Sequence, residues 1–559
     1  MIVHPAHWRR AQLAAIRFCV TLAALALAAV GATAATAAAA AASGSGSGPV
    51  VTTDDGAVRG VTAGTVDEFL GIPYAAPPTG NLRWRPPQPP AAWRGVRDAT
   101  QFAPSCPQPT SGNPFAPPGP FSEDCLYLNV YTPGLPGGDR DHRLARSADG
   151  DGRPVLVWIH GGGLVQEAGR NYDGARLAAG GAVVVTINYR LGALGFLAHP
   201  ALASRPGGPA GNYGLMDQQA ALRWVQDNIS RFGGDPGHVA IAGQSAGGLS
   251  VLAQLVSAGA RGLFQRAIVQ SGAFALNQQP LATAEAAGQA FAGALGCPGQ
   301  TAQTAACLRN LPVADLVTPN FVGIPGVVDG KVLTEPIGAA LAAGRFARVP
   351  VLNGTNHDEE RLFVDGLGVT VSGGSFVPIP YQPVTPDNYQ ANIAAVLGVS
   401  AGRAAAIAAE YPPSPSPLTD ASLSTLVSDA NFACPALQVD QQTAQRVPTF
   451  AYEFNDDNAP NPYTDGLLGV ATHESELPYL FDLPNAPFHG TFTPGQQTLA
   501  ASMRAAWANF AATGNPATAA LPWPAFSTGS AQMLSLVPPQ PQLETDFATR
   551  HHCAFWAAG

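Results

Sequence analysis

Four short motifs succeed one another along this chain, and each contains a residue type that nucleophilic catalysis requires. They are WIHGGG at 158–163, GQSAG at 243–247, GTNHDEE at 354–360 and GVATHESE at 469–476. Together they supply a serine, a carboxylate, a histidine and glycines whose backbone N–H groups are accessible. The chain order Ser, acid, His predicts a serine nucleophile on a sharp strand-to-helix turn.

The G-x-S-x-G pattern occurs twice, around Ser245 and around Ser400, so its context must distinguish the two serines. The nucleophile needs a buried strand before it and a helix after it, because the strained turn between them exposes the hydroxyl. The apolar run at 237–242 and the helical pattern at 246–253 meet this requirement. Residues 388–397, before Ser400, are Ala-rich and helical. We therefore predict that Ser245 is the nucleophile and that Ser400 lies in a surface loop or helix cap.

Four histidines follow the acidic motif and are candidates for the general base: His473, His489, His551 and His552. His489 lies in a Pro-rich stretch, and the last two lie near the chain end, where a structural role is favoured. The apolar turn LPYLF at 477–481 can fix the imidazole of His473. His473 is therefore the predicted base, and a hydrogen-bonded surface histidine is the alternative.

The acid that orients the base comes from three adjacent carboxylates, Asp358, Glu359 and Glu360. Their spacing alone does not select one of them. The two that are not used are expected to be solvated or salt-bridged, as is usual in a run of charges.

The oxyanion formed during acyl transfer needs backbone N–H donors that no side chain obstructs. Gly162 and Gly163 can supply two donors, and Ala246 adds the N–H that follows the nucleophile at a helix start. We expect His160 to support the glycine loop structurally.

The segments around the motifs alternate between strand and helix. Continuous apolar runs at 154–160 and 182–188 are typical of strands buried on both faces of a mostly parallel sheet, and 216–229 shows helical spacing. Further strands are expected at 126–131, 264–270, 349–354 and 449–454, with an antiparallel hairpin within 50–71. The alternation predicts a doubly wound α/β fold. Ala-rich helical insertions at 275–345 and 385–430 would cover the carboxyl edge of the sheet, where ligands bind.

Residues 1–48 differ from the rest of the chain, and 49–559 are expected to form one domain with insertions. Arginines precede an apolar stretch at 18–30, which is too short for a membrane span and is followed by an Ala/Gly/Ser-rich segment. This pattern predicts a signal peptide, a secreted product and no stable membrane insertion once the signal is removed. A retained anchor is the alternative.

Cysteine usage fits an exported chain. Six cysteines remain beyond the predicted signal: Cys106, Cys125, Cys297, Cys307, Cys434 and Cys553. An even number favours disulfides, although spacing alone does not choose the pairing and buried free thiols are the alternative. The sequence contains no C-x-x-C or H-E-x-x-H, so we expect no metal and no cofactor.

Charge argues against a nucleic-acid partner. The formal net charge is -9, only 12% of residues are charged, and Lys331 is the only lysine. No basic stripe is present to neutralise a phosphate backbone.

From about residue 50 to 556, the chain resembles the type-B carboxylesterase family, which includes cholinesterases and bacterial para-nitrobenzyl esterases. The resemblance is carried by the four motifs and by FLGIPYA, SEDCLYLNV, NYRLGALGFL and NYGLMDQQAALRWVQDNISRFGGDP. It implies an α/β-hydrolase fold, with a large, mostly parallel central sheet flanked by helices and helical insertions over an active-site gorge. It also implies that Glu359 is the catalytic acid. The implied disulfides are Cys106 to Cys125, Cys297 to Cys307, and Cys434 to Cys553.

The chain departs from the family pattern at four positions. Gln244 stands where Glu is frequent, which removes a negative charge that would favour the protonated base. Leu164 replaces an aromatic residue and is expected to reshape the acyl side of the pocket, and Glu474 stands where Gly is common. Phe115 replaces a tryptophan of cholinesterases, which argues against choline binding because a quaternary ammonium prefers an indole face.

These observations predict an exported, metal-independent carboxylic-ester hydrolase that acts through an acyl-enzyme. Its expected partner is a small or medium apolar ester. Two alternatives are a non-catalytic binding or adhesion member of the same fold, and an amide or carbamate hydrolase with the same triad.

Overall fold

The computed structural model describes residues 48–109, 117–136, 152–203, 208, 210–317, 326–416, 419–460, 469–484 and 491–558. The predicted signal peptide, Phe115 and His489 lie outside these residues. Residues 48–559 form one compact unit.

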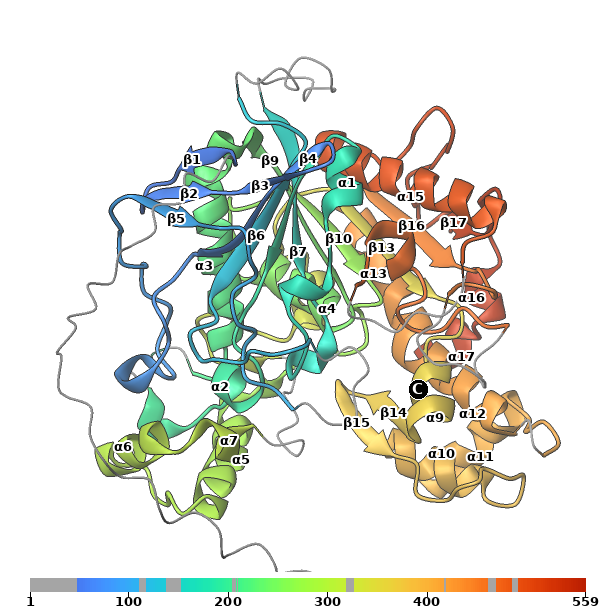
Figure 1. The fold of residues 1–559 in the computed structure, drawn as a ribbon. Coiled ribbons are helices and arrows are strands. Elements are labelled where there is room, and N and C mark those ends of the chain that lie inside the picture. The colour runs from blue at the N-terminus through green and yellow to red at the C-terminus, as the bar shows by residue number, and fades with distance from the viewer. Residues whose placement is uncertain are drawn as a thin grey trace, which may run out of the picture. The chain divides into compact units, whose positions relative to one another are not determined.

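An 11-stranded sheet crosses this unit (Figure 1). In spatial order its strands are β18 (Gln542–Glu544), β17 (Met533–Leu536), β16 (Thr449–Phe454), β13 (Val351–Asn356), β10 (Arg266–Gln270), β9 (Gly234–Gln244), β7 (Arg153–Ile159), β8 (Val183–Ile187), β6 (Tyr127–Thr132), β4 (Val66–Pro73) and β3 (Val61–Ala63). Neighbouring strands are parallel from β8 to β17 and antiparallel at both edges. The expected α/β-hydrolase architecture is therefore confirmed, and the strands predicted around the motifs form its centre.

Helices cover both faces of the sheet, as the continuous apolar strands require. Along β7, Val155 and Val157 belong to a core cluster with α3 (Tyr213–Asn228) and α4 (Ala246–Val256). The alternate residues Leu156 and Trp158 belong to a second cluster with α15 (Pro494–Thr513). Each of these strand side chains is essentially buried, so both faces of β7 stabilise the fold.

The remaining elements lie at the ends and edges of the sheet. The helices are α1 (Ala175–Ala179), α2 (Gly192–Phe196), α5 (Leu281–Ala294), α6 (Ala302–Asn310), α7 (Val313–Leu316), α8 (Ile337–Ala342), α9 (Arg361–Leu367), α10 (Tyr389–Leu397), α11 (Ala401–Glu410), α12 (Thr419–Ser428), α13 (Cys434–Ala444), α14 (Leu477–Leu480), α16 (Phe547–Arg550) and α17 (Cys553–Ala557). The short strands are β1 (Val50–Thr52), β2 (Ala57–Arg59), β5 (Val96–Asp98), β11 (Gln279–Pro280), β12 (Val327–Val328), β14 (Val369–Ser372) and β15 (Ser375–Pro378). The predicted N-terminal hairpin is present as the antiparallel pair of β1 and β2.

Both Ala-rich insertions are helical, as expected. Figure 1 shows α5, α6 and α7 together on one side of the molecule, and α9 to α12 together with β14 and β15 on another. The antiparallel pair of β14 and β15 was not predicted, and it contributes a wall of the cavity described below.

Strand register brings the motifs to one edge of the sheet. Ile159 at the end of β7 is paired with Gly243, one residue before the end of β9. Gln270 at the end of β10 is paired with Gln244 on one side and Gly354 of β13 on the other. Because carboxyl ends of parallel strands meet at the same edge, the glycine loop, Ser245 and the acidic motif start from neighbouring points.

Three disulfides are present, joining Cys106 to Cys125, Cys297 to Cys307, and Cys434 to Cys553. These are the pairings that the family resemblance implied. Among the described helices, none alone has the length and apolar character needed to cross a bilayer, whereas the pair α10 and α11, bent by 115°, meets those criteria when taken together.

Candidate active site

Ser245 lies on a strained turn between β9 and α4. Its backbone has φ 55° and ψ -125°, a conformation that side-chain-bearing residues rarely adopt. Glycines make the turn possible, because a Cβ on Gly243 would lie 2.5 Å from the backbone of Gly247, and one on Gly247 would lie 2.0 Å from the carbonyl oxygen of Ile159. Ser400, by contrast, begins α11, and its Oγ accepts a hydrogen bond from the Arg403 N–H at 3.3 Å. The prediction that Ser400 is a helix cap is confirmed.

Glu359 and His473 form a buried hydrogen-bonded pair. The imidazole Nδ1 donates to Glu359 Oε2 at 2.5 Å, and both side chains are nearly inaccessible to solvent. The other carboxylate oxygen accepts from the Thr355 hydroxyl and from the Asn356 N–H, both at 2.7 Å. A carboxylate oxygen accepts this hydrogen bond, so Nδ1 is the donor and Nε2 is turned away from Glu359.

The structure separates the three adjacent acids. Asp358 contacts the His357 ring at 3.0 Å and is salt-bridged when that histidine is protonated, as expected. The expectation for Glu360 is wrong, because this side chain is neither solvated nor salt-bridged. It is fully buried and accepts hydrogen bonds from the Val371 N–H at 3.0 Å and from the Asn431 amide at 3.2 Å. Burial raises the pKa of Glu360 to about 8, although the hydrogen bonds from Asn431 and Val371 oppose this rise, so the group is largely protonated at pH 7.

The Nε2 atom of His473 contacts the side chain of Gln244. The two nitrogens lie 3.1 Å apart, and because His473 Nε2 is the acceptor, the amide group of Gln244 donates. No hydrogen bond joins Ser245 Oγ to His473 within the described residues. Ser245 and His473 nevertheless line the same cavity, so the turn that carries Ser245 and the Glu359–His473 pair meet at one place.

The glycine loop lies directly against the serine turn. A Cβ built on Gly161 would lie 3.3 Å from Ser245 Cβ. Gly162 and Gly163 open a short helical turn with φ 75° and 63°, and Ala246 is the first residue of α4. The N–H of Ala246 has no partner within α4 because it is the first residue of that helix, and the two glycines have no side chain to obstruct their N–H groups, so these three amides suit an oxyanion.

His160 supports this loop in the way the sequence suggested. Its ring stacks on Tyr189 with centroids 4.3 Å apart, and the Tyr189 hydroxyl donates to the His160 carbonyl at 2.8 Å. Burial lowers the pKa of His160 to about 3, so this imidazole is neutral.

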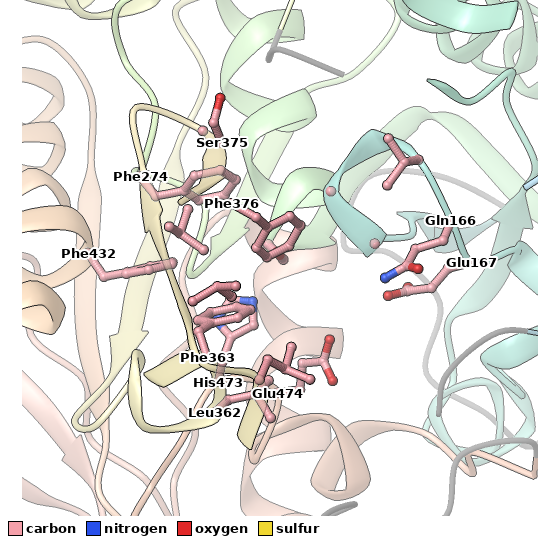
Figure 2. Close-up of a pocket in the computed structure, with 18 of the residues that line it drawn as sticks. Gln166, Glu167, Phe274, Leu362, Phe363, Ser375, Phe376, Phe432, His473 and Glu474 are labelled. Carbon is pink, nitrogen blue, oxygen red and sulfur yellow. The ribbon is translucent and has the colours of Figure 1, made fainter. Parts of the chain in front are cut away.

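Ser245 and His473 line a cavity of about 290 Å³. Figure 2 shows His473 among the other residues of its wall. One wall is aromatic and aliphatic. Its members are Phe274, Leu362, Phe363, Leu367, Val369, Val371, Phe376 and Phe432. Gln166, Glu167 and Glu474 provide polar groups. The rings of Phe363 and Phe432 lie 5.1 and 5.3 Å from the imidazole of His473. Sequence reasoning missed the aromatic wall, because residues 361–378 contain no catalytic motif.

The expectation for Leu164 is wrong. This side chain is buried within the core cluster that includes β7 and β8, and it is not among the residues that line the cavity. Its left-handed backbone, with φ 62°, belongs to the turn that carries it into the core. Phe376, which lines the cavity, lies beside the glycine loop, 3.3 Å from a Cβ built on Gly163.

One group of possible metal ligands exists among the described residues, formed by His357, Glu453 and His551, with ligand atoms within 4.8 Å of one another. Both ring nitrogens of His551 are already engaged, Nδ1 with Asp429 and Nε2 with Glu453, each at 2.6 Å. Burial lowers the pKa of His551, but these two carboxylates outweigh it and raise the pKa to about 9. The group is therefore an ion-pair network, and His551 has a structural role.

A serine on a strand-to-helix turn at the carboxyl edge of such a sheet defines an α/β-hydrolase. Beyond that class, the model of the carboxylesterase family matches residues 47–556, so the chain belongs to this family and is a carboxylic-ester hydrolase.

Individual relatives agree with this assignment. The chain is 37% identical to "Fumonisin B1 esterase" of Sphingopyxis macrogoltabida over 83% of this chain and 82% of the relative. It is 35% identical to "Para-nitrobenzyl esterase" of Bacillus subtilis (strain 168), over 87% and 94%, and 36% identical to "Cocaine esterase" of Homo sapiens, over 86% of each. A solved structure of PNB esterase superposes with a TM-score of 0.73 at 32% identity, covering 90% of this chain and 98% of that one.

Proposed function

We propose that this esterase acts through a Ser245, His473 and Glu359 triad. The observation that carries the proposal is the 2.5 Å hydrogen bond from His473 Nδ1 to Glu359, in a cavity that Ser245 also lines. This bond leaves Nε2 as the nitrogen that faces the cavity as a base, and the turn between β9 and α4 places the hydroxyl of Ser245 in the same cavity.

In the first half-reaction, Ser245 Oγ bonds to the ester carbonyl carbon while its proton passes to His473 Nε2. The tetrahedral intermediate collapses when the C–O bond to the alcohol breaks and His473 returns the proton to the leaving oxygen. Water then attacks the acyl-enzyme with the same base, which releases the acid and restores Ser245. Glu359 stabilises the imidazolium that forms in each half.

Negative charge on the carbonyl oxygen is stabilised by backbone donors. We assign this role to the N–H groups of Gly162, Gly163 and Ala246, which begin two helical turns beside Ser245. Loss of one such donor typically costs about 100-fold or more in turnover.

Small or medium esters with apolar parts fit the cavity. Its volume of about 290 Å³ and its phenylalanine wall favour such substrates, and the relatives named above are esterases. Export is also part of the proposal, supported by the sequence of residues 1–48 and by the three disulfides.

The test is a burst of alcohol from a chromogenic ester, followed by slower steady-state turnover. We expect Ser245→Ala to abolish the burst. Ser400→Ala is the matched control, because it changes the same pentapeptide pattern at a helix cap and should leave the burst intact. A folded wild-type protein without any turnover would instead favour the binding or adhesion alternative. Faster hydrolysis of an anilide than of its matched ester would favour the amidase alternative.

A further inference from the structure

Glu474 contributes a buried carboxylate that no described residue satisfies. It directly follows His473, is 7% exposed, and lines the cavity. Its Oε2 atom is buried and has no hydrogen-bond partner among the described residues. A buried polar atom without a partner is costly, so a donor supplied from the cavity would stabilise this side chain.

Glu167 places a second carboxyl group in the same cavity. It is 2% exposed, and its Oε2 accepts a hydrogen bond from the Tyr172 hydroxyl at 2.6 Å. Figure 2 shows the carboxyl groups of Glu167 and Glu474 pointing into the space between the glycine-loop segment and the phenylalanine cluster. The two groups are electrostatically coupled: burial raises the pKa of both, to about 7 for Glu167, and repulsion from Glu167 raises that of Glu474 further.

No arginine or lysine lies among the residues that line the cavity, so no such side chain offsets the burial and repulsion that raise the pKa of the two carboxyl groups. A ligand that brings a positive charge and a hydrogen-bond donor to the Glu474 carboxyl group would stabilise its ionised form in the cavity. A protonated primary, secondary or tertiary amine has both the charge and an N–H group, whereas a quaternary ammonium has no N–H; a primary or secondary amine offers more than one N–H donor to the two carboxyl groups. The phenylalanine wall can hold the apolar remainder of the same molecule.

We propose that Glu474, together with Glu167, binds the protonated amine of an ester substrate, so that the preferred substrates are apolar esters bearing a primary or secondary amine. This inference rests on the proposed function, because it places the amine in the cavity of the Ser245 hydroxyl. Glu474 is then a specificity-determining residue.

The experiment compares ester pairs that differ only by ammonium against methyl. The acyl-side pair is p-nitrophenyl ε-aminocaproate and p-nitrophenyl heptanoate; the alcohol-side pair is γ-aminopropyl butyrate and butyl butyrate. For each pair, kcat/KM is measured at several pH values above 7, where Glu167, with a pKa of about 7, is ionised, and the spontaneous rate is subtracted. We expect Glu474→Gln to lower the amine-to-neutral ratio of kcat/KM about 10-fold or more in at least one pair. The pair that responds locates the amine on the acyl or the alcohol side.

Two further variants keep the result interpretable. Glu474→Gly relieves the left-handed backbone of this residue, with φ 72°, so it should fold and show the same fall in the ratio. Glu335→Gln changes the net charge equally at an ion pair with Arg345 outside the cavity, and should leave the ratio unchanged.

An unchanged ratio in both Glu474 variants would overturn the inference while leaving the esterase mechanism intact. An equal loss with amine and neutral esters would also overturn it, because Glu474 would then act on His473 and not on the substrate. If the wild-type protein hydrolyses neither member of either pair, and Ser245→Ala changes nothing, the proposed function itself has failed.

Discussion

Gln244 donates a hydrogen bond to Nε2 of His473 at 3.1 Å, the nitrogen that takes the proton of Ser245 in the proposed mechanism. Both side chains are 1% exposed. The imidazole is thus fixed at its two nitrogens, by Glu359 on one side and by Gln244 on the other. In the proposed mechanism, His473 Nε2 gives up its hydrogen bond from Gln244 and accepts one from Ser245. The residue before the serine therefore affects how readily His473 accepts the proton.

Gln244→Glu should move the acidic limb of the kcat/KM profile to higher pH by about one unit, because a carboxylate beside Nε2 favours the protonated imidazole. The profile is measured with a neutral ester between pH 4 and 9, roughly the range over which an imidazole base titrates. Gln497→Glu adds the same charge at an exposed position of α15 that does not contact His473. It should leave the acidic limb of the kcat/KM profile in place. A limb that does not move would show that residue 244 does not govern the base.

Glu359→Gln should lower kcat by about 10³- to 10⁴-fold with little change in KM, because the amide no longer stabilises the imidazolium in the transition state. Glu360→Gln is the matched variant at the next position. Burial raises the pKa of Glu360 to about 8, so the wild-type group is largely neutral at pH 7 and the amide replaces it with little loss. Comparable losses in both variants would contradict the assignment of Glu359.

The sequence could predict those elements whose local residue pattern is compatible with only one kind of structure. Continuous apolar runs before the motifs had to be buried strands, and strands that precede Ser245 and the acidic motif had to end at one edge. Glu359 needed the family resemblance, because the contacts that distinguish it from its neighbours are tertiary, such as the hydrogen bond between its carboxylate and His473.

The cavity wall could not be predicted in the same way. Phe363 and Phe376 come from α9 and β15, and only the tertiary fold brings them beside His473 and the glycine loop. Glu167 carried no signal, and Glu474 appeared only as a departure from a common glycine. Their proximity depends on the positions of two loops far apart in the sequence, which local propensity does not encode.

Removal of the Cys434–Cys553 disulfide should destabilise the protein more than removal of the Cys297–Cys307 disulfide. The first spans 119 residues and the second spans 10, and a longer closed loop restricts the unfolded chain more strongly. In the chain-entropy model the difference is about 2 kcal/mol in the free energy of unfolding. Urea unfolding of the two Cys-to-Ser double variants measures it, and equal losses would indicate that native-state contacts outweigh chain entropy.

Stability should fall at alkaline pH through the network around His551. This imidazole is 3% exposed and is bonded to Asp429 and Glu453, with His357 and Arg550 close by. The folded-state pKa of about 9 lies above the ordinary 6.5, so the stabilisation is complete below pH 6.5 and is lost as the pH rises through 9.

His551→Gln should therefore reduce the free energy of unfolding most at pH 6, and the deficit relative to wild type should shrink by an amount on the order of 3 kcal/mol by pH 10. The control His238→Gln alters a half-buried histidine that pairs with Asp235, and its effect should stay below about 1 kcal/mol across the range. Denaturant melts at several pH values measure both variants. A His551→Gln deficit that is constant with pH would mean that the ring acts through packing and neutral hydrogen bonds, because only a group that stays protonated in the folded state makes the deficit vary in this direction.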